Sequence, residues 1–196
     1  DKPAGPSDVL VYINNEAYAA SAAAELLAQL EHDPDAQAFC LSENKDVLKL
    51  IKKEITKQLP LLSRQEILEK SIHNLELFIS EPETSIQSIN DIAAEHVVLL
   101  IDNAKAILPK IKHGGSIFCG PYTPVTLGDY FAGPNHVLPT SGTARFASPL
   151  GVMDFMKFSS HLTYSKSALA EAKPYLKELT ALEEFDAHNK AVEIRL

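Results

Sequence analysis

The chain has 196 residues, of which 45% are hydrophobic, so it can bury one sizeable core. Its formal net charge of -8 and its lack of a basic run argue against nucleic acid and anionic membranes as partners. No apolar stretch reaches transmembrane length and no signal peptide is recognisable. The two cysteines form neither a CxxC pair nor a Cys/His cluster, which excludes a cysteine-based zinc knuckle and favours a reducing, cytoplasmic compartment. The abrupt start, almost directly before a strand, is typical of the middle of a protein.

Short apolar runs alternate with helical segments over the first two thirds of the chain. The apolar runs predict buried strands at residues 9–13, 36–41, 75–79, 97–101 and 116–119. Helices are expected at residues 16–30, 43–58 (capped by Ser42), 84–93 and 104–111, with a short extra helix opened by a capping box of Ser63 and Glu66. This alternation predicts an α/β fold, a mostly parallel sheet flanked by helices that resembles an incomplete Rossmann fold.

The pattern changes after Pro149. Residues 150–157 predict a short helix, 161–164 a strand, 165–182 a long helix and 192–196 a strand-like tail. This section has too little apolar surface for a core of its own. We therefore expect a domain at residues 1–148 and a C-terminal extension at 149–196 that packs on a partner subunit, most simply in a homodimer.

One loop-like stretch, residues 128–140, places Asp129 and His136 between glycines and prolines. Loops of this kind present side chains to ligands, and the pair could bind a metal or relay a proton. It could equally cap the turns of the loop. Ligands of parallel sheets collect at the carboxyl ends of the strands. This loop follows a strand, so it is expected at that edge of the sheet. His96 precedes a strand, so the same rule does not place it there.

Three further groups could carry chemistry. Gln29 and His32 lie three residues apart at a predicted helix end, where they could ligate a metal. Alternatively, His32 could interact favourably with the helix dipole at that end. Glu95 and His96 suit proton transfer near neutral pH, or a solvated helix end. His188 follows acidic residues in a polar segment and reads as exposed. The glycine-rich motif GxGxxG is absent, so no motif in this sequence indicates dinucleotide binding.

Several motifs, in order, resemble the histidinol dehydrogenase family. The segment AGPSDVLV at residues 4–11 is similar to the family's AGPSEVLV, QLEHDP at 29–34 to QAEHDP, and AEH at 94–96 to the start of PEHL. GPYTP at 120–124, GDY at 128–130, GPNHVLPT at 133–140 and GTARF at 142–146 match almost letter for letter, and AHNKAV at 187–192 resembles the closing TAHKNAV. Family members are about twice as long, so the chain resembles their C-terminal half.

The resemblance implies an enzyme that oxidises L-histidinol to L-histidine through an aldehyde, with two NAD. It implies zinc held by Gln29, His32, Asp129 and His188, with two substrate nitrogens completing the coordination. His96 is implied as the general base and Glu95 as the residue that activates water. The residues implied to bind the substrate are Ser7, Gln29, His32, His96, Asp129, His136, Glu183 and His188.

In the family, Glu183 and His188 reach across from the other subunit of a dimer, and most NAD contacts lie in the half that precedes this chain. The chain by itself is therefore expected to be inactive. The alternative is a fragment that keeps only the zinc-binding and dimerisation surfaces. Departures from the family pattern are Asp8 for glutamate, Ala93 for proline, Val125 for an acidic residue, and residues 184–186 for Gly-Leu-Thr.

Overall fold

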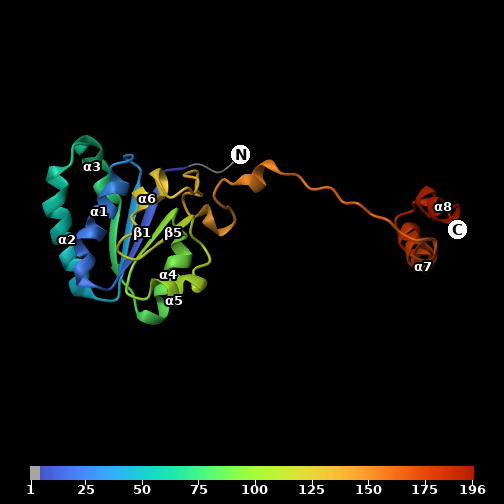
Figure 1. Ribbon diagram of the computed structural model, residues 1–196, viewed down its shortest axis with the longest axis horizontal. Coiled ribbons are helices and arrows are strands. Elements are labelled where there is room, and N and C mark those ends of the chain that lie inside the picture. Colours follow the sequence, from blue (N-terminus) through green and yellow to red (C-terminus); the bar gives the residue numbers. More distant parts are fainter. Residues whose placement is uncertain (1–4) are drawn as a thin grey trace. The chain divides into compact units, whose positions relative to one another are not determined.

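The computed structural model describes residues 5–196 and divides between Asp154 and Phe155 into two compact units. The sequence places the division between residues 148 and 149. Figure 1 shows the first unit as a sheet between helices and the second as a pair of helices. The motif at residues 4–11 begins just outside the described residues, since Ala4 is not among them.

The first unit contains a five-stranded sheet, within the described residues, with the strand order β3-β2-β1-β4-β5. Every neighbouring pair of strands is parallel. This confirms the predicted α/β class. The strands are β1 (Asp8–Ile13), β2 (Gln37–Ser42), β3 (Leu75–Ile79), β4 (His96–Leu100) and β5 (Ser116–Cys119).

Helices cover both faces of this sheet (Figure 1). One face is packed by α1 (Ala19–Leu30), α2 (Lys45–Gln58) and α3 (Gln65–Ser71), and the other by α4 (Pro82–Ile92) and α5 (Ala104–Ile107). The chain adds strands in one direction from β1 to β3 and in the opposite direction from β4 to β5. Right-handed crossovers that run in opposite directions place their helices on opposite faces, which explains this division.

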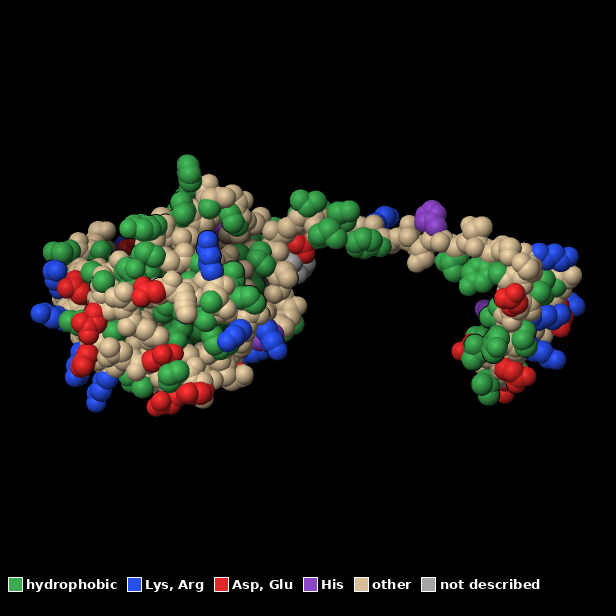
Figure 2. Space-filling view, turned by 60° about the horizontal axis from the view of Figure 1, so that its bottom comes forward, with side chains coloured by type: hydrophobic (Ala, Val, Ile, Leu, Met, Phe, Trp, Pro, Cys, Tyr) green, Lys and Arg blue, Asp and Glu red, His purple; other side chains and the backbone are tan. Residues whose placement is uncertain are grey.

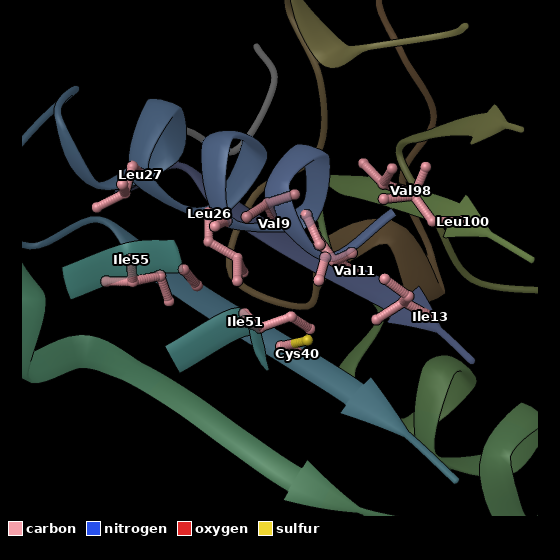
Figure 3. Close-up of a cluster of buried hydrophobic side chains, with 14 of the residues drawn as sticks. Val9, Val11, Ile13, Leu26, Leu27, Cys40, Ile51, Ile55, Val98 and Leu100 are labelled. Atoms are coloured by element: carbon pink, nitrogen blue, oxygen red, sulfur yellow. The ribbon is translucent and has the colours of Figure 1, made fainter. Parts of the chain in front are cut away.

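The core lies on both sides of β1, whose six residues are all buried. Val9, Val11 and Ile13 point toward α1 and α2, where Leu26 and Ile51 meet them (Figure 3). The alternate side chains of β1 pack on the other face with residues of α4 and β4. Residues 9–13 of this strand are apolar because both of its faces are buried, which is why the run was visible in the sequence.

Several predicted ends need correction. Asn44, not Ser42, caps α2 by accepting a hydrogen bond from the Asp46 amide at 2.9 Å. The capping box at Ser63 is wrong, because α3 starts after Arg64 without a side-chain cap. Helix α4 ends where Ala93 takes a left-handed conformation with φ of 53°. Short 3-10 helices flank the α-helices at Glu16–Tyr18, Leu59–Leu61, Ile72–Asn74 and Leu108–Lys110.

The end of the chain is helical. The predicted long helix is confirmed as α7 (Lys166–Leu182), and the side chain of Ser165 caps it. The predicted strand at residues 161–164 is wrong, and the predicted helix at 150–157 is only a 3-10 turn, Val152–Phe155. The strand-like tail is also wrong, because α8 (Asp186–Glu193) occupies this segment. Alternation over so few residues cannot separate a strand from an amphipathic helical turn.

The second unit leaves large apolar side chains on its surface, where they appear green in Figure 2. Leu182 is 82% exposed and Tyr175 is 71% exposed. Helices α7 and α8 pack on each other but have no buried residues. No helix among residues 5–196 is both long and apolar enough to cross a membrane.

Candidate active site

The candidate site lies at the amino edge of the sheet, not at its carboxyl edge. Ser7 directly precedes β1, and Glu95 and His96 stand where β4 begins. A helix that follows a parallel strand runs back toward the start of the strands, so its last turn reaches the same edge. Helix α1 thus delivers Gln29 there, and helix α6 (Val125–Tyr130) delivers Asp129. The expectation that this loop marks the carboxyl edge is therefore wrong, and its first residues belong to a helix.

Glu95 has a buried carboxyl group that is held by its neighbours. The Ser7 hydroxyl donates a short hydrogen bond to Glu95 Oε2, and the Asp8 amide donates another at 3.3 Å. Burial raises the pKa of Glu95 to about 7, although both hydrogen bonds lower it, and the nearby charges of Asp8 and Asp129 add to the rise. A carboxyl group that titrates near neutral pH can act as a general base there.

His96 lies between two carboxylates. Its Nδ1 is 3.9 Å from Glu95 Oε2 and its Nε2 is 3.9 Å from Asp129 Oδ1, and the side chain is 6% exposed. Burial lowers the pKa of His96, against an opposing effect of Asp129. The Phe118 ring packs against the imidazole with centroids 6.0 Å apart. A neutral, buried imidazole beside an acidic residue can accept a proton from a ligand.

Gln29, His32 and Asp129 line one cavity of about 250 Å³. Gln29 is 3% exposed, and its buried Nε2 has no hydrogen-bond partner. The amide oxygen of Gln29, the imidazole of His32 and the carboxylate of Asp129 form a donor set that suits a divalent metal bound by nitrogen and oxygen. No group of three or more His, Cys, Asp or Glu side chains within residues 5–196 is arranged to hold a metal by itself.

A larger cleft of about 510 Å³ joins most of the predicted residues. Its lining consists of Ser7, His32, Glu95, His96, Asp129, Tyr130 and His136. The structure therefore brings His136, from the loop after α6, to the same cleft as the residues at the strand starts. Gln29 reaches the neighbouring cavity instead, and His32 and Asp129 line both.

Glu183 and His188 belong to the second unit. Glu183 ends α7, and His188 is on α8, where its ring stacks on Phe185 with centroids 4.9 Å apart. The segment around His188, which reads as polar in the sequence, is thus a helix, and its His188 ring packs on Phe185.

Two carboxylates near the site had no role in the sequence analysis. Glu25 lies one helical turn before Gln29 on α1 and accepts a hydrogen bond from the Val125 amide at 3.3 Å. Burial raises the pKa of Glu25. Glu25 lies four residues before Gln29, so both were expected on one face of the helix, and this spacing could have identified Glu25 from the sequence. Asp8, which is 3% exposed, was noted only as a departure from the family motif.

Comparisons with known proteins agree with this geometry. The family model for histidinol dehydrogenase matches residues 1–196. The histidinol dehydrogenase of Oceanobacillus iheyensis is 45% identical over 100% of this chain and 46% of that protein, and that of Bacillus thuringiensis subsp. konkukian is 48% identical with the same coverage. A crystal structure of histidinol dehydrogenase from Elizabethkingia anophelis superimposes with a TM-score of 0.94 at 33% identity, over 100% of this chain and 45% of that one. The chain spans about half the length of the curated relatives it matches. Because the family model matches the whole chain and the motifs of the first unit meet at one edge of the sheet, the chain belongs to the histidinol dehydrogenase family.

Proposed function

We propose that this chain supplies the acid–base and metal-binding part of an enzyme that oxidises L-histidinol to L-histidine through L-histidinaldehyde, with two NAD. The observation that carries the proposal is the pair formed by Glu95 and His96. The pKa of the carboxyl group is raised to about 7 and that of the imidazole is lowered, in a cleft shared with His32 and Asp129.

His96 acts as the general base for the alcohol. Its imidazole is buried and its Nδ1 has no hydrogen-bond partner, while Nε2 faces Asp129 without reaching hydrogen-bonding distance. Because Nδ1 is buried, Nε2 is the ring nitrogen that accepts the proton of a ligand hydroxyl on the side of Asp129. The Asp129 carboxylate stabilises the imidazolium that forms.

Glu95 acts on the aldehyde. Oxidation of an aldehyde to an acid requires a water molecule that adds to the carbonyl carbon, and this water must lose a proton. The Glu95 carboxylate takes that proton, and the Ser7 hydroxyl beside it orients the carboxyl group and contacts the substrate. Two steps with different bases thus share one cleft.

Gln29, His32 and Asp129 hold the zinc ion in this proposal, together with His188. Bound zinc would orient the substrate through its amino and imidazole nitrogens, and bound NAD would serve as the hydride acceptor. Gln29 would bind zinc through its amide oxygen, and its burial beside His32 and Asp129 supports this role. His136 and Glu183 bind the substrate, and the apolar surface of α7 and α8 supports a homodimer in which His188 and Glu183 serve the partner's site.

A chimera tests the activity. In the Oceanobacillus iheyensis relative, the segment that aligns with this chain is replaced by residues 1–196. The chimera is expected to reduce NAD when histidinol is added, whereas the chain alone is expected not to. A folded chimera without histidinol-dependent NAD reduction, beside an active host protein, would contradict the proposal.

Metal analysis tests the ligands independently of activity. The chimera, dialysed against zinc and then against buffer, is expected to hold about one zinc per chain, as the proposed four-ligand site requires. Asp129→Ala should lose most of it, and Asp102→Asn, at the opposite edge of the sheet, should keep it. If zinc is retained without any NAD reduction, the alternative of a chain that keeps only its zinc and dimer surfaces gains support.

A further inference from the structure

Asp8 and Glu95 are tied to each other by two reciprocal hydrogen bonds. The Asp8 amide donates to Glu95 Oε2 at 3.3 Å, and the Glu95 amide donates to Asp8 Oδ2 at 3.3 Å. The two residues stand one position before Val9 and His96, which are partners in the β1–β4 ladder. Each side chain therefore satisfies a backbone amide of the other strand at the point where the ladder starts.

The second oxygen of Asp8 binds a third segment. The Ser141 amide donates to Asp8 Oδ1 at 3.0 Å, and Ser141 has a left-handed backbone with φ of 52°. The loop also approaches the segment before β1 closely, because a Cβ at Gly5 would lie 2.9 Å from Ser141 Oγ. Asp8 thus joins the starts of β1 and β4 to the loop that follows His136.

Both carboxylate oxygens of Asp8 are engaged in a position that is 3% exposed. Burying a carboxylate is costly unless it is hydrogen-bonded, so a purely apolar residue would serve this core position better if packing were its only task. The motif that the chain resembles has glutamate here, so Asp8 makes both contacts with a side chain that is one methylene shorter.

We propose that Asp8 is a positioning residue that fixes the main chain and carboxyl group of Glu95 for the activation of water. Resting on the proposed function, this inference assigns Asp8 to the aldehyde step alone. The Asp8 carboxylate binds the amides of Glu95 and Ser141, whereas His96 interacts with Asp8 only through the Asp8 backbone, which Asp8→Asn leaves in place. Hydride transfer between alcohol and aldehyde needs no activated water, so it should depend little on Asp8.

The test uses Asp8→Asn in the active chimera. Asparagine has the same shape, but its amide group turns a donor toward one of the two backbone amides, so one hydrogen bond is lost. L-histidinaldehyde is then oxidised with NAD, which requires water, and separately reduced with NADH, which does not. We expect oxidation to fall about tenfold, as for the loss of one hydrogen bond to a charged group, and reduction to change less than about threefold.

A double-mutant cycle with Glu95→Gln separates positioning from general damage. If Asp8 acts through Glu95, Asp8→Asn should cost little further oxidation in the Glu95→Gln background. Asp8→Glu keeps both acceptor oxygens and should retain the ratio of oxidation to reduction. If Asp8→Asn does not fold, Asp8→Ser, which is smaller and cannot accept from both backbone amides, takes its place with the same expected change in the ratio. Asp102→Asn removes the same charge at the opposite edge and should change neither rate.

Equal losses in both directions, or fully additive effects in the cycle, would overturn the assignment and make Asp8 a structural residue. An unchanged ratio in folded Asp8→Asn would overturn it as well. These outcomes differ from failure of the proposed function, in which the unmodified chimera itself would not oxidise histidinol.

Discussion

At the scale of single residues, burial rather than charge pairing controls the chemistry of the site. Glu95 and His96 are adjacent in sequence, yet their nearest charged atoms are 3.9 Å apart, too far for a hydrogen bond. Removal from water is the largest cause of both pKa shifts, upward for the carboxyl group and downward for the imidazole. Both groups are thereby biased toward their neutral forms.

Glu95→Gln should make the metal-free chain more stable relative to wild type as the pH rises. The folded-state pKa of Glu95 is about 7 and its usual value is 4.5, so folded protein holds this proton more tightly than unfolded protein does. The stability from the protonated group is fully present below pH 4.5 and is lost as the pH rises through about 7.

Urea unfolding in the presence of a chelator, at pH 5 and at pH 8, measures the difference in the free energy of unfolding between the variant and wild type. After a discount for solvent screening, this difference should shift in favour of the variant by on the order of 2 kcal/mol from pH 5 to pH 8. A gap that does not change with pH would show that Glu95 is not buried as a neutral acid.

His96→Ala in the chimera should lower turnover by about 10²–10⁴-fold, the usual contribution of a general base, and weaken histidinol binding much less. Steady-state kinetics with histidinol separates kcat from KM. A raised KM with unchanged kcat would instead identify His96 as a residue that only binds the substrate.

At the scale of elements, the site depends on the close contact between the starts of β4 and β5. The Ser116 amide donates to the Glu95 carbonyl at 2.8 Å, and a Cβ at Gly115 would lie only 2.5 Å from that carbonyl oxygen. The clash is with backbone, so it cannot be relieved by turning a side chain. Glycine is therefore required for close approach at this position, without any need for positive φ.

Gly115→Ala should destabilise the chain by about 1–3 kcal/mol, the usual cost of overpacking. Gly151→Ala is the matched control, because a Cβ there meets nothing within 4 Å, and it should stay within about 0.5 kcal/mol of wild type. Urea midpoints of the three proteins measure the effect. Equal midpoints for both variants would mean that β4 and β5 can separate at their starts without cost.

At the scale of the whole molecule, the contrast between the two units supports the proposed homodimer. The first unit has two apolar clusters, one on each face of the sheet, whereas α7 and α8 have no buried residue. Exposed apolar surface of this kind is typical of an interface. A two-fold dimer uses the same patches on both chains, so it would form two equivalent composite sites.

Mixed dimers test whether each site is shared. Asp129→Ala and His188→Ala chimeras should each be nearly inactive. In a mixed dimer one site carries both lesions and the other combines an intact Asp129 with an intact His188 of the partner subunit. Unfolding and refolding the two variants together should restore up to about a quarter of the wild-type activity, because half of the dimers are mixed and each has one good site. If mixed dimers form and activity stays absent, His188 serves its own subunit.

The sequence by itself determined the strands and the family. Residues 9–13 and 97–101 read as buried because a strand covered on both faces carries apolar residues at every position, which is a local signal. The motifs around Gln29, Glu95 and Asp129 named the residues of the site for the same reason, since each motif lies within a few positions. The end of the chain was read less well, because a short apolar alternation does not separate a strand from a helix such as Asp186–Glu193.

Only the tertiary structure decided where the site lies and what surrounds it. Gln29 and Asp129 meet at the amino edge because α1 and α6 run back along the sheet, and this direction is a property of the fold and not of either motif. The pKa values of Glu95 and His96 depend on burial by segments far away in sequence, which no local pattern encodes. The role inferred for Asp8 likewise rests on amides from residues 95 and 141, which become its neighbours only when the strands and the loop have come together.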